Sequence, residues 1–188
     1  DQIDFSKFSG DINPILIDPI AARRTLSGQC IVHGMHSLLW ALDSLAKVKG
    51  ISASKIRVRF LQPIFLDEEV YCIWNQQKKE LSLSTDGLKL AAISLELESI
   101  EANNDIQTSI ENPRNGPNNL TFLECSKLTN QGFKIFGDVD LSKKLFPFFS
   151  HLFGIATACE IGALSQIIGM ECPGLHSLYV SLAIEIKK

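Results

Sequence analysis

The feature that most constrains the fold is a long apolar segment, residues 31–48. Its apolar side chains fall near helical spacing and occupy most sides of the expected helix. A helix with so little polar surface is normally enclosed by other elements. Lys47, Lys49 and Gly50 then supply a helix stop. The sequence therefore predicts a central helix that the rest of the chain has to cover.

A set of alternating segments follows this helix. Residues 55–60 alternate polar and apolar side chains, as a half-buried strand does. Asp86-Gly87 is a hairpin turn signal. Three more strands are expected, at residues 70–75, 79–84 and 89–97. A buried helix followed by consecutive strands predicts the α+β class, with an antiparallel sheet wrapped around the helix.

The segment before the central helix is expected to contain short helices. Residues 2–22 open with a helical pattern that Pro14 interrupts. Asp18-Pro19 has the chemistry of a helix N-cap with proline at the first position, and it predicts one or two turns over residues 19–24.

A second apolar region repeats the pattern of the first. Residues 148–168 have a helical pattern, with Gly169 as the expected stop, and residues 178–186 alternate like a strand. We interpret the two regions as an internal duplication whose second copy is incomplete. The chain is then a fragment, or its partner strands come from another molecule. The predicted parts are a first region, a polar linker and a second region, at residues 1–98, 99–119 and 120–188.

Composition narrows the function classes. The net charge of -3 and the sequence pI of about 5.8 give no basic face, so nucleic acid is not an expected partner. Five cysteines without the spacing of a metal site favour free thiols in a reducing, cytoplasmic compartment and no metal. Neither a signal segment nor a membrane span is expected, so we predict no membrane partner.

Two short segments on either side of residues 19–30 form a motif that resembles a known family signature. Residues 9–18 read SGDINPILID, and residues 31–35 read IVHGM. At this spacing they resemble the signature of MaoC-like dehydratases and (R)-specific enoyl-CoA hydratases. The resemblance covers most of residues 3–98 and, less closely, residues 145–187. It implies a hot-dog fold, here a double hot-dog with an incomplete second copy.

The resemblance also implies a site and a reaction. Members of this family add water reversibly to a trans-2-enoyl thioester of coenzyme A or of a carrier protein, and they need no further cofactor. The reaction is general acid–base chemistry, with negative charge growing on the thioester oxygen. By position, Asp11 resembles the acidic residue, Asn13 an orienting residue, and Gly34 the source of the backbone N–H that meets the charge.

The sequence departs from the family at one catalytic position. The family's catalytic histidine falls at Leu16, and leucine cannot carry a proton. Hydratase activity is therefore expected to be reduced or lost, unless His36 near the helix start replaces the missing base. A histidine near a helix end is more often solvated or satisfied by neighbours. His33 is expected to be a structural residue of the loop.

Two arginines have two interpretations. Arg57 and Arg59 alternate with apolar residues in the first strand, so they face away from the apolar side. They can meet the phosphates of coenzyme A or of a pantetheine arm. The alternative is a plain exposed strand face. Asp11 likewise has an alternative interpretation: it can simply cap a turn and have no role in a site.

Three functions are consistent with these residues. The first is a MaoC-like hydratase or dehydratase, a lyase of acyl-CoA and fatty acid metabolism. The second is a non-catalytic module that keeps the fold and binds acyl thioesters or serves assembly. The third is a hot-dog thioesterase that uses Asp11. Because hot-dog sheets usually pair, a homodimer or an internal pseudo-dimer is expected.

Overall fold

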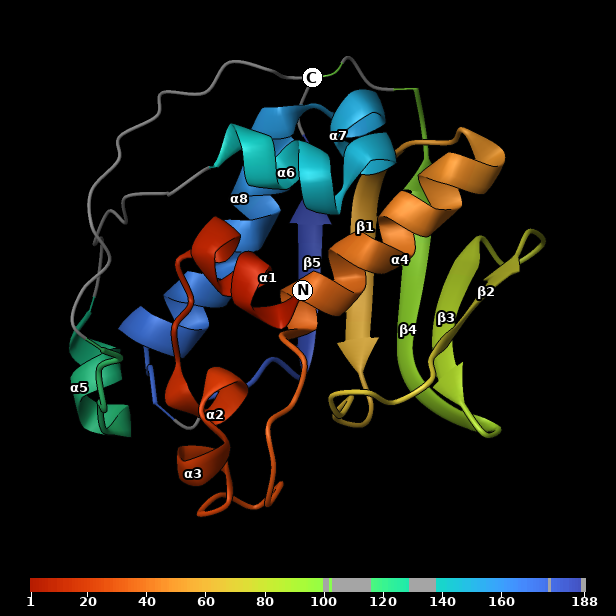
Figure 1. The fold of residues 1–188 in the computed structure, drawn as a ribbon. Coiled ribbons are helices and arrows are strands. Elements are labelled where there is room, and N and C mark those ends of the chain that lie inside the picture. Colours follow the sequence, from red (N-terminus) through yellow and green to blue (C-terminus); the bar gives the residue numbers. More distant parts are fainter. Residues whose placement is uncertain (100–101, 103–115, 129–137, 176, 187–188) are drawn as a thin grey trace.

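A five-stranded antiparallel sheet forms one layer of the molecule (Figure 1). The structure is a computed structural model, and it describes residues 1–99, 102, 116–128, 138–175 and 177–186. The strands are β1 (Ala53–Phe60), β2 (Tyr71–Asn75), β3 (Glu80–Thr85), β4 (Leu88–Leu97) and β5 (Ser181–Glu185). Their order in the sheet is β2-β3-β4-β1-β5, and every neighbouring pair is antiparallel.

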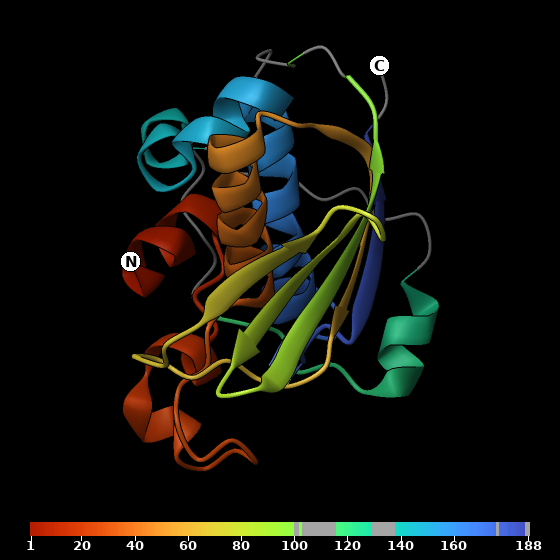
Figure 2. The same ribbon diagram turned by 90° about the vertical axis from the view of Figure 1, so that its right-hand side faces the viewer.

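The predicted central helix is α4 (Gly34–Lys49), which packs on one face of this sheet (Figure 2). Met35, Leu38 and Leu39 on α4 have no exposed surface. The helix ends at Gly50, which adopts the left-handed conformation with φ 60° and donates its N–H to Ala46. The helix and its stop are thus confirmed, together with the sheet that covers them.

The predicted hairpin is also confirmed. β3 and β4 are joined by Asp86 and Gly87, whose φ angles are 41° and 81°. Two consecutive positive φ angles are what a tight hairpin turn between twisted strands requires. Asp and Gly are among the residues that tolerate them.

The chain before α4 forms three short helices. These are α1 (Gln2–Ser9), α2 (Pro14–Ile17) and α3 (Pro19–Ala22). Asn13 caps α2 and Asp18 caps α3, each through its side-chain oxygen. Both caps are followed by proline, which needs no N–H partner at the first helical position. The predicted cap at Asp18 is therefore confirmed.

The second apolar region differs from its prediction. Instead of one helix over residues 148–168, the chain forms α7 (Pro147–Phe153), α8 (Ile155–Gln166) and a π-helical turn, η1 (Ile167–Glu171). Gly154, with φ 92° and ψ 150°, separates α7 from α8, because this backbone conformation cannot continue a helix. Gly169 lies inside η1 and is not the predicted stop.

The bend between α7 and α8 also divides the most apolar helical segment of the second region. Among the described residues, no single helix is both long enough and apolar enough to cross a membrane. Residues 147–153 and 155–171 meet the length and composition requirement only as a pair, and that pair is bent by 116°.

The second region packs directly onto the first. Figure 2 shows α8 beside α4 on the same face of the sheet, and β5 pairs with β1 from Lys55↔Glu185 to Arg59↔Ser181. One hydrophobic core includes Phe5 and Phe8 of the first region and Phe149 of the second. The two regions therefore share a core within the described part of the chain.

Two elements of the second region were not predicted from the sequence. They are α5 (Phe122–Lys127) and α6 (Val139–Leu145). The predicted linker, residues 99–119, lies mostly outside the described residues. Its described end, residues 116–119, runs along the turn that follows η1, where Asn119 forms a bridge with Gly174.

Candidate active site

The loop between α1 and α2 holds Asp11. Gly10 adopts the left-handed conformation, with φ 75°, as it ends α1. The N–H of Asp11 donates to Ser9 Oγ at 3.2 Å, and Asp11 Oδ1 accepts from the Asn13 N–H at 3.1 Å. The carboxylate therefore folds back over its own loop in the local turn that the Ser-Gly-Asp-x-Asn pattern favours.

The second region covers this carboxylate. Ser165 on α8 donates its hydroxyl to Asp11 Oδ2 at 2.7 Å, and Asn13 Nδ2 donates to the Gly169 carbonyl at 2.9 Å. A Cβ atom at Gly169 would lie 2.5 Å from both carboxylate oxygens of Asp11. Only glycine allows the backbone of η1 to approach this closely. Asp11 is consequently only 2% exposed.

Burial sets the acidity of Asp11. Removal from water raises its pKa to about 6, and the hydrogen bonds from Ser165 and from the Asn13 N–H oppose that rise. Because a pKa of about 6 is near neutral, the side chain can exchange a proton under ordinary conditions. The structure thus brings Asp11 and Asn13 together, and it adds two residues from the other region.

His33 is the nearest imidazole to Asp11. It is 1% exposed, and its Nε2 lies 3.1 Å from the Asp11 carbonyl oxygen and 3.9 Å from Oδ2. Because a carbonyl only accepts, we assign the proton to Nε2. Nδ1 is then a buried acceptor that has no partner in the described structure. Burial lowers the pKa of His33 to about 4, which keeps the ring neutral at pH 7.

Leu16 is the residue at which the motif resemblance predicts the family's catalytic histidine. It is 4% exposed and packs with Ile15 and Ile31. Partly buried apolar side chains surround these three residues: Ile17, Phe65 and Leu175. Leu16 therefore belongs to an apolar cluster to which both regions contribute.

Gly34 begins α4 beside an apolar cavity of about 370 Å³. The ring of Phe60 lies 3.3 Å from the position that a Gly34 Cβ would take, so a side chain here would press on the ring. Leu178, Tyr179 and Val180 of the second region line the same cavity. The first N–H groups of a helix have no partner within the helix, so they can meet a ligand oxygen. Asp11 is not among the lining residues.

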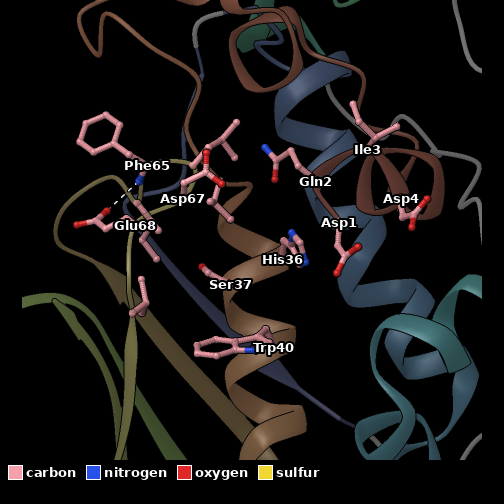
Figure 3. Close-up of a pocket in the computed structure, with 14 residues that line it drawn as sticks. Asp1, Gln2, Ile3, Asp4, His36, Ser37, Trp40, Phe65, Asp67 and Glu68 are labelled. Atoms are coloured by element: carbon pink, nitrogen blue, oxygen red, sulfur yellow. Dashed lines mark hydrogen bonds between the residues drawn. The ribbon is translucent and has the colours of Figure 1, made fainter.

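His36 lies in different surroundings from Asp11. Its ring stacks on Phe5, with 4.6 Å between the ring centroids and 5° between the planes. It lines a neighbouring cavity of about 630 Å³, together with Trp40 and Glu68 (Figure 3). This cavity shares Val32, Ser37 and Ile64 with the cavity beside Gly34, but Gly34 does not line it. Burial lowers the pKa of His36 to about 3. The described contacts include none between His36 and Asp11, so its role as a replacement base stays a prediction.

The predicted phosphate-binding arginines lie on the sheet surface. Both Arg57 and Arg59 are exposed on β1, and they alternate with Ile56 and Val58, which face the core. Arg57 forms an ion pair with Glu96 at 2.8 Å, as one exposed side chain beside another on neighbouring strands. The structure does not bring either arginine to Asp11 or to the cavity beside Gly34.

Sequence reasoning missed the residues that complete the site. Ser165 and Gly169 lie more than 150 residues after Asp11 along the chain, and Tyr179 donates its hydroxyl to the Leu164 carbonyl nearby. The spacing of small residues in GALSQIIG gives a weak signal that another segment approaches this helix closely. Among the residues that the structure describes, no group of three metal-ligating side chains occurs.

The chain is similar to one protein family and to solved structures. The family described as "MaoC like domain" matches residues 1–89. Two solved structures resemble parts of the chain: an (R)-hydratase from A. caviae involved in PHA biosynthesis and protein af1124 from Archaeoglobus fulgidus. The first is 26% identical over 50% of this chain and 84% of its own. The second is 23% identical over 50% and 70%, and both have TM-scores of 0.35. No curated protein matches.

The family match and the fold lead to one assignment. An antiparallel sheet around a central helix, within a segment that matches the MaoC-like domain, is the α+β hot-dog architecture. The function of this family is of the hydratase or dehydratase type. Residues 1–89 therefore match the MaoC-like domain family, and the fold of the region agrees with that match.

Proposed function

We propose that this chain binds an acyl thioester beside the start of α4, and that its own hydration of an enoyl thioester is reduced by orders of magnitude. One observation carries the proposal: Leu16 is packed in an apolar cluster where the family's catalytic histidine would stand. The other residues of the motif resemblance, Asp11, Asn13 and Gly34, are present in the sequence.

The chemistry explains why this single change matters. Hydration needs one group that removes a proton from water and one that delivers a proton to C2 of the substrate. Asp11 retains a carboxylate, but both of its oxygens accept hydrogen bonds, from Ser165 and from the Asn13 N–H. Removing one member of a catalytic pair typically lowers the rate by several orders of magnitude.

The cavity beside Gly34 supports the binding part of the proposal. It is lined mostly by apolar side chains, among them Leu61, Ile64 and Leu90. An acyl chain can replace water there, while the thioester oxygen meets an N–H at the start of α4. Apolar lining with a few convergent polar groups is typical of small-molecule sites.

Crotonyl-CoA tests both parts. We expect saturable binding by calorimetry, together with a very slow loss of enoyl absorbance. Leu16→His should raise the hydration rate by about 10-fold or more, because it restores the second proton-transfer group. Leu16→Met serves as the matched control, since it keeps the apolar cluster and should leave the rate unchanged. Fast hydration by the natural chain, unaffected by Leu16→His, would show that the proposal is wrong.

A second candidate function keeps catalysis in the natural chain. The observation that favours it is the pKa of Asp11, about 6, beside the neutral ring of His33 at 3.9 Å. Asp11 would then serve as the only acid–base residue of a slow hydratase. Asp11→Asn should abolish any residual rate under this candidate. A residual rate that survives Asp11→Asn excludes it.

A further inference from the structure

Two neighbouring cavities share part of their lining. The cavity beside Gly34 (the Gly34 cavity) has a volume of about 370 Å³, and the cavity that His36 lines (the His36 cavity) has a volume of about 630 Å³. Three residues line both of them: Val32, Ser37 and Ile64. These three residues, the partition, are where a ligand in the Gly34 cavity meets the other cavity.

Backbone contacts join the two segments that carry the partition. The Val32 N–H donates to the Ile64 carbonyl at 2.8 Å, and the preceding residue, Ile31, forms an antiparallel bridge with Phe65. Ser37 belongs to α4 and is only 6% exposed. Because backbone hydrogen bonds hold the two segments together, the side chains of Val32 and Ile64 stay between the cavities.

The two sides of the partition differ in chemistry. Among its described lining residues, the Gly34 cavity has no acidic, basic or histidine side chain. The His36 cavity is lined by four carboxylates: Asp1, Asp4, Asp67 and Glu68 (Figure 3). An apolar chain end that enters there displaces water from charged groups and offers them no hydrogen bond in return. The Gly34 cavity therefore favours an acyl chain, and the His36 cavity does not.

The mouth of the Gly34 cavity fixes the direction of the ligand. Leu26, Leu178 and Val180 line this cavity, and each of them is more than half exposed. The thiol carrier of an acyl thioester is too large for the cavity, so it has to lie on this exposed side. The acyl chain then points inward, toward the partition.

We propose that the partition restricts the ligand to thioesters of short, apolar acyl groups, with Val32 and Ile64 as the specificity-determining residues. The inference rests on the proposed binding of an acyl thioester beside Gly34. Each methylene that the cavity buries should raise the affinity about 4-fold. Once the chain end reaches the partition, further methylenes find no apolar space, and forcing them in costs affinity as overpacking does.

Calorimetry with a series of saturated acyl-CoA thioesters, from butyryl to dodecanoyl, tests this limit. Saturated thioesters cannot be hydrated, so binding is measured apart from any catalysis. For the natural chain, the affinity should rise from butyryl-CoA to hexanoyl-CoA. Dodecanoyl-CoA should bind about 10-fold more weakly than hexanoyl-CoA, or worse.

Variants of the partition should move the limit. Val32→Ala and Ile64→Ala each remove part of the partition from a different segment and keep the backbone hydrogen bond. Each should raise the affinity for dodecanoyl-CoA, relative to hexanoyl-CoA, by about 10-fold. Leu178→Ala is the matched control: it removes an apolar side chain from the mouth of the same cavity, so it should weaken both ligands equally. Urea unfolding checks that each variant is folded.

The outcomes separate this inference from the proposed function. If hexanoyl-CoA shows no saturable binding, both are wrong. If the affinity of the natural chain keeps rising through dodecanoyl-CoA, the inference is overturned while the proposed binding stands. The same holds if the ratio of the two affinities is unchanged in both partition variants.

Discussion

The two helix–strand units of this chain make different use of one pattern. In the first, α4 is a single helix that ends at Gly50 and leads within a few residues to β1. In the second, α8 is bent away from α7 at Gly154, continues into a π-helical turn, and reaches β5 only after a longer turn. Both helices lie on the same face of one sheet, and their strands pair with each other (Figure 2).

The two units present opposite ends of their helices to the candidate site. The first unit presents the beginning of α4, where Gly34 borders an open apolar cavity. The second unit presents the end of its helix, where Ser165 and Gly169 cover Asp11. The motif of one unit is therefore completed by the other. The start of α4 borders the cavity, while the carboxylate of Asp11 is withdrawn from solvent.

A close contact between the two units, at Gly169, gives the prediction with the largest expected effect. Gly169→Ala places a Cβ 2.5 Å from both carboxylate oxygens of Asp11, so η1 must move away. We expect a loss of about 3 kcal/mol in the free energy of unfolding, measured with urea. Gly28→Ala is the control: it has open space and only an unfavourable φ of 67°, which costs about 1 kcal/mol. Equal losses in both variants would contradict the close contact.

The next prediction concerns the pairing of β1 with β5. Ile184 packs against the shared core opposite Ile56, which has no exposed surface. Ile184→Lys should lower the free energy of unfolding by about 2 kcal/mol, because a charge replaces an apolar contact. Its neighbour Ala183 faces solvent opposite Arg57, so Ala183→Glu should change stability by less than about 0.5 kcal/mol. A separate unfolding transition for the second unit in Ile184→Lys would show that the two units do not share one cooperative core.

The sequence predicted the local elements of the first unit well. Residues 31–48 and the strands after them follow strong hydrophobic periods, and Asp86-Gly87 allows little besides a tight turn. In the second unit, the period of residues 148–168 is helical throughout, but the break at Gly154 depends on how α7 packs against α4. Periodicity identifies which face is apolar, and it does not fix where a buried helix bends.

The candidate site was predictable only in its first half. Asp11, Asn13 and Gly34 belong to one short motif, so their spacing identified them. Ser165 and Gly169 contact Asp11 only because the second unit folds onto the first. That contact joins residues far apart in the chain, and it leaves only a faint pattern of small residues in the sequence.

The buried carboxylate gives a prediction about pH. The pKa of Asp11 is about 6 in the folded chain, and the ordinary value of 3.8 applies to the unfolded chain. The folded chain therefore holds this proton more tightly. The resulting stabilisation is complete below about pH 4 and is lost as the pH rises through about 6. Asp11→Asn removes this dependence. Relative to the natural chain, it should therefore gain about 2 kcal/mol between pH 4 and pH 7.

Urea unfolding at several pH values measures this difference. His33 and His36 have lowered pKa values and give the opposite slope, but they are present in both proteins and largely cancel. Because the main cause is burial, the difference should persist in 1 M salt, where the attraction between exposed charges is screened. A difference that is the same at pH 4 and pH 7 would mean that Asp11 is not buried as described.

The smallest effects are expected on the sheet surface that neither helix covers. Arg57 is about half exposed and pairs with Glu96, so Arg57→Ala should cost at most about 0.5 kcal/mol of stability. If acyl-CoA binds beside Gly34, then neither Arg57→Ala nor Arg59→Ala should change its affinity measurably, since both side chains alternate with those that face the core. A loss of affinity for acyl-CoA, but not for the same acyl group on a short thiol, would instead assign the coenzyme phosphates to this surface. The ligand would then extend from the helix side of β1 around its end to the outer face of the sheet.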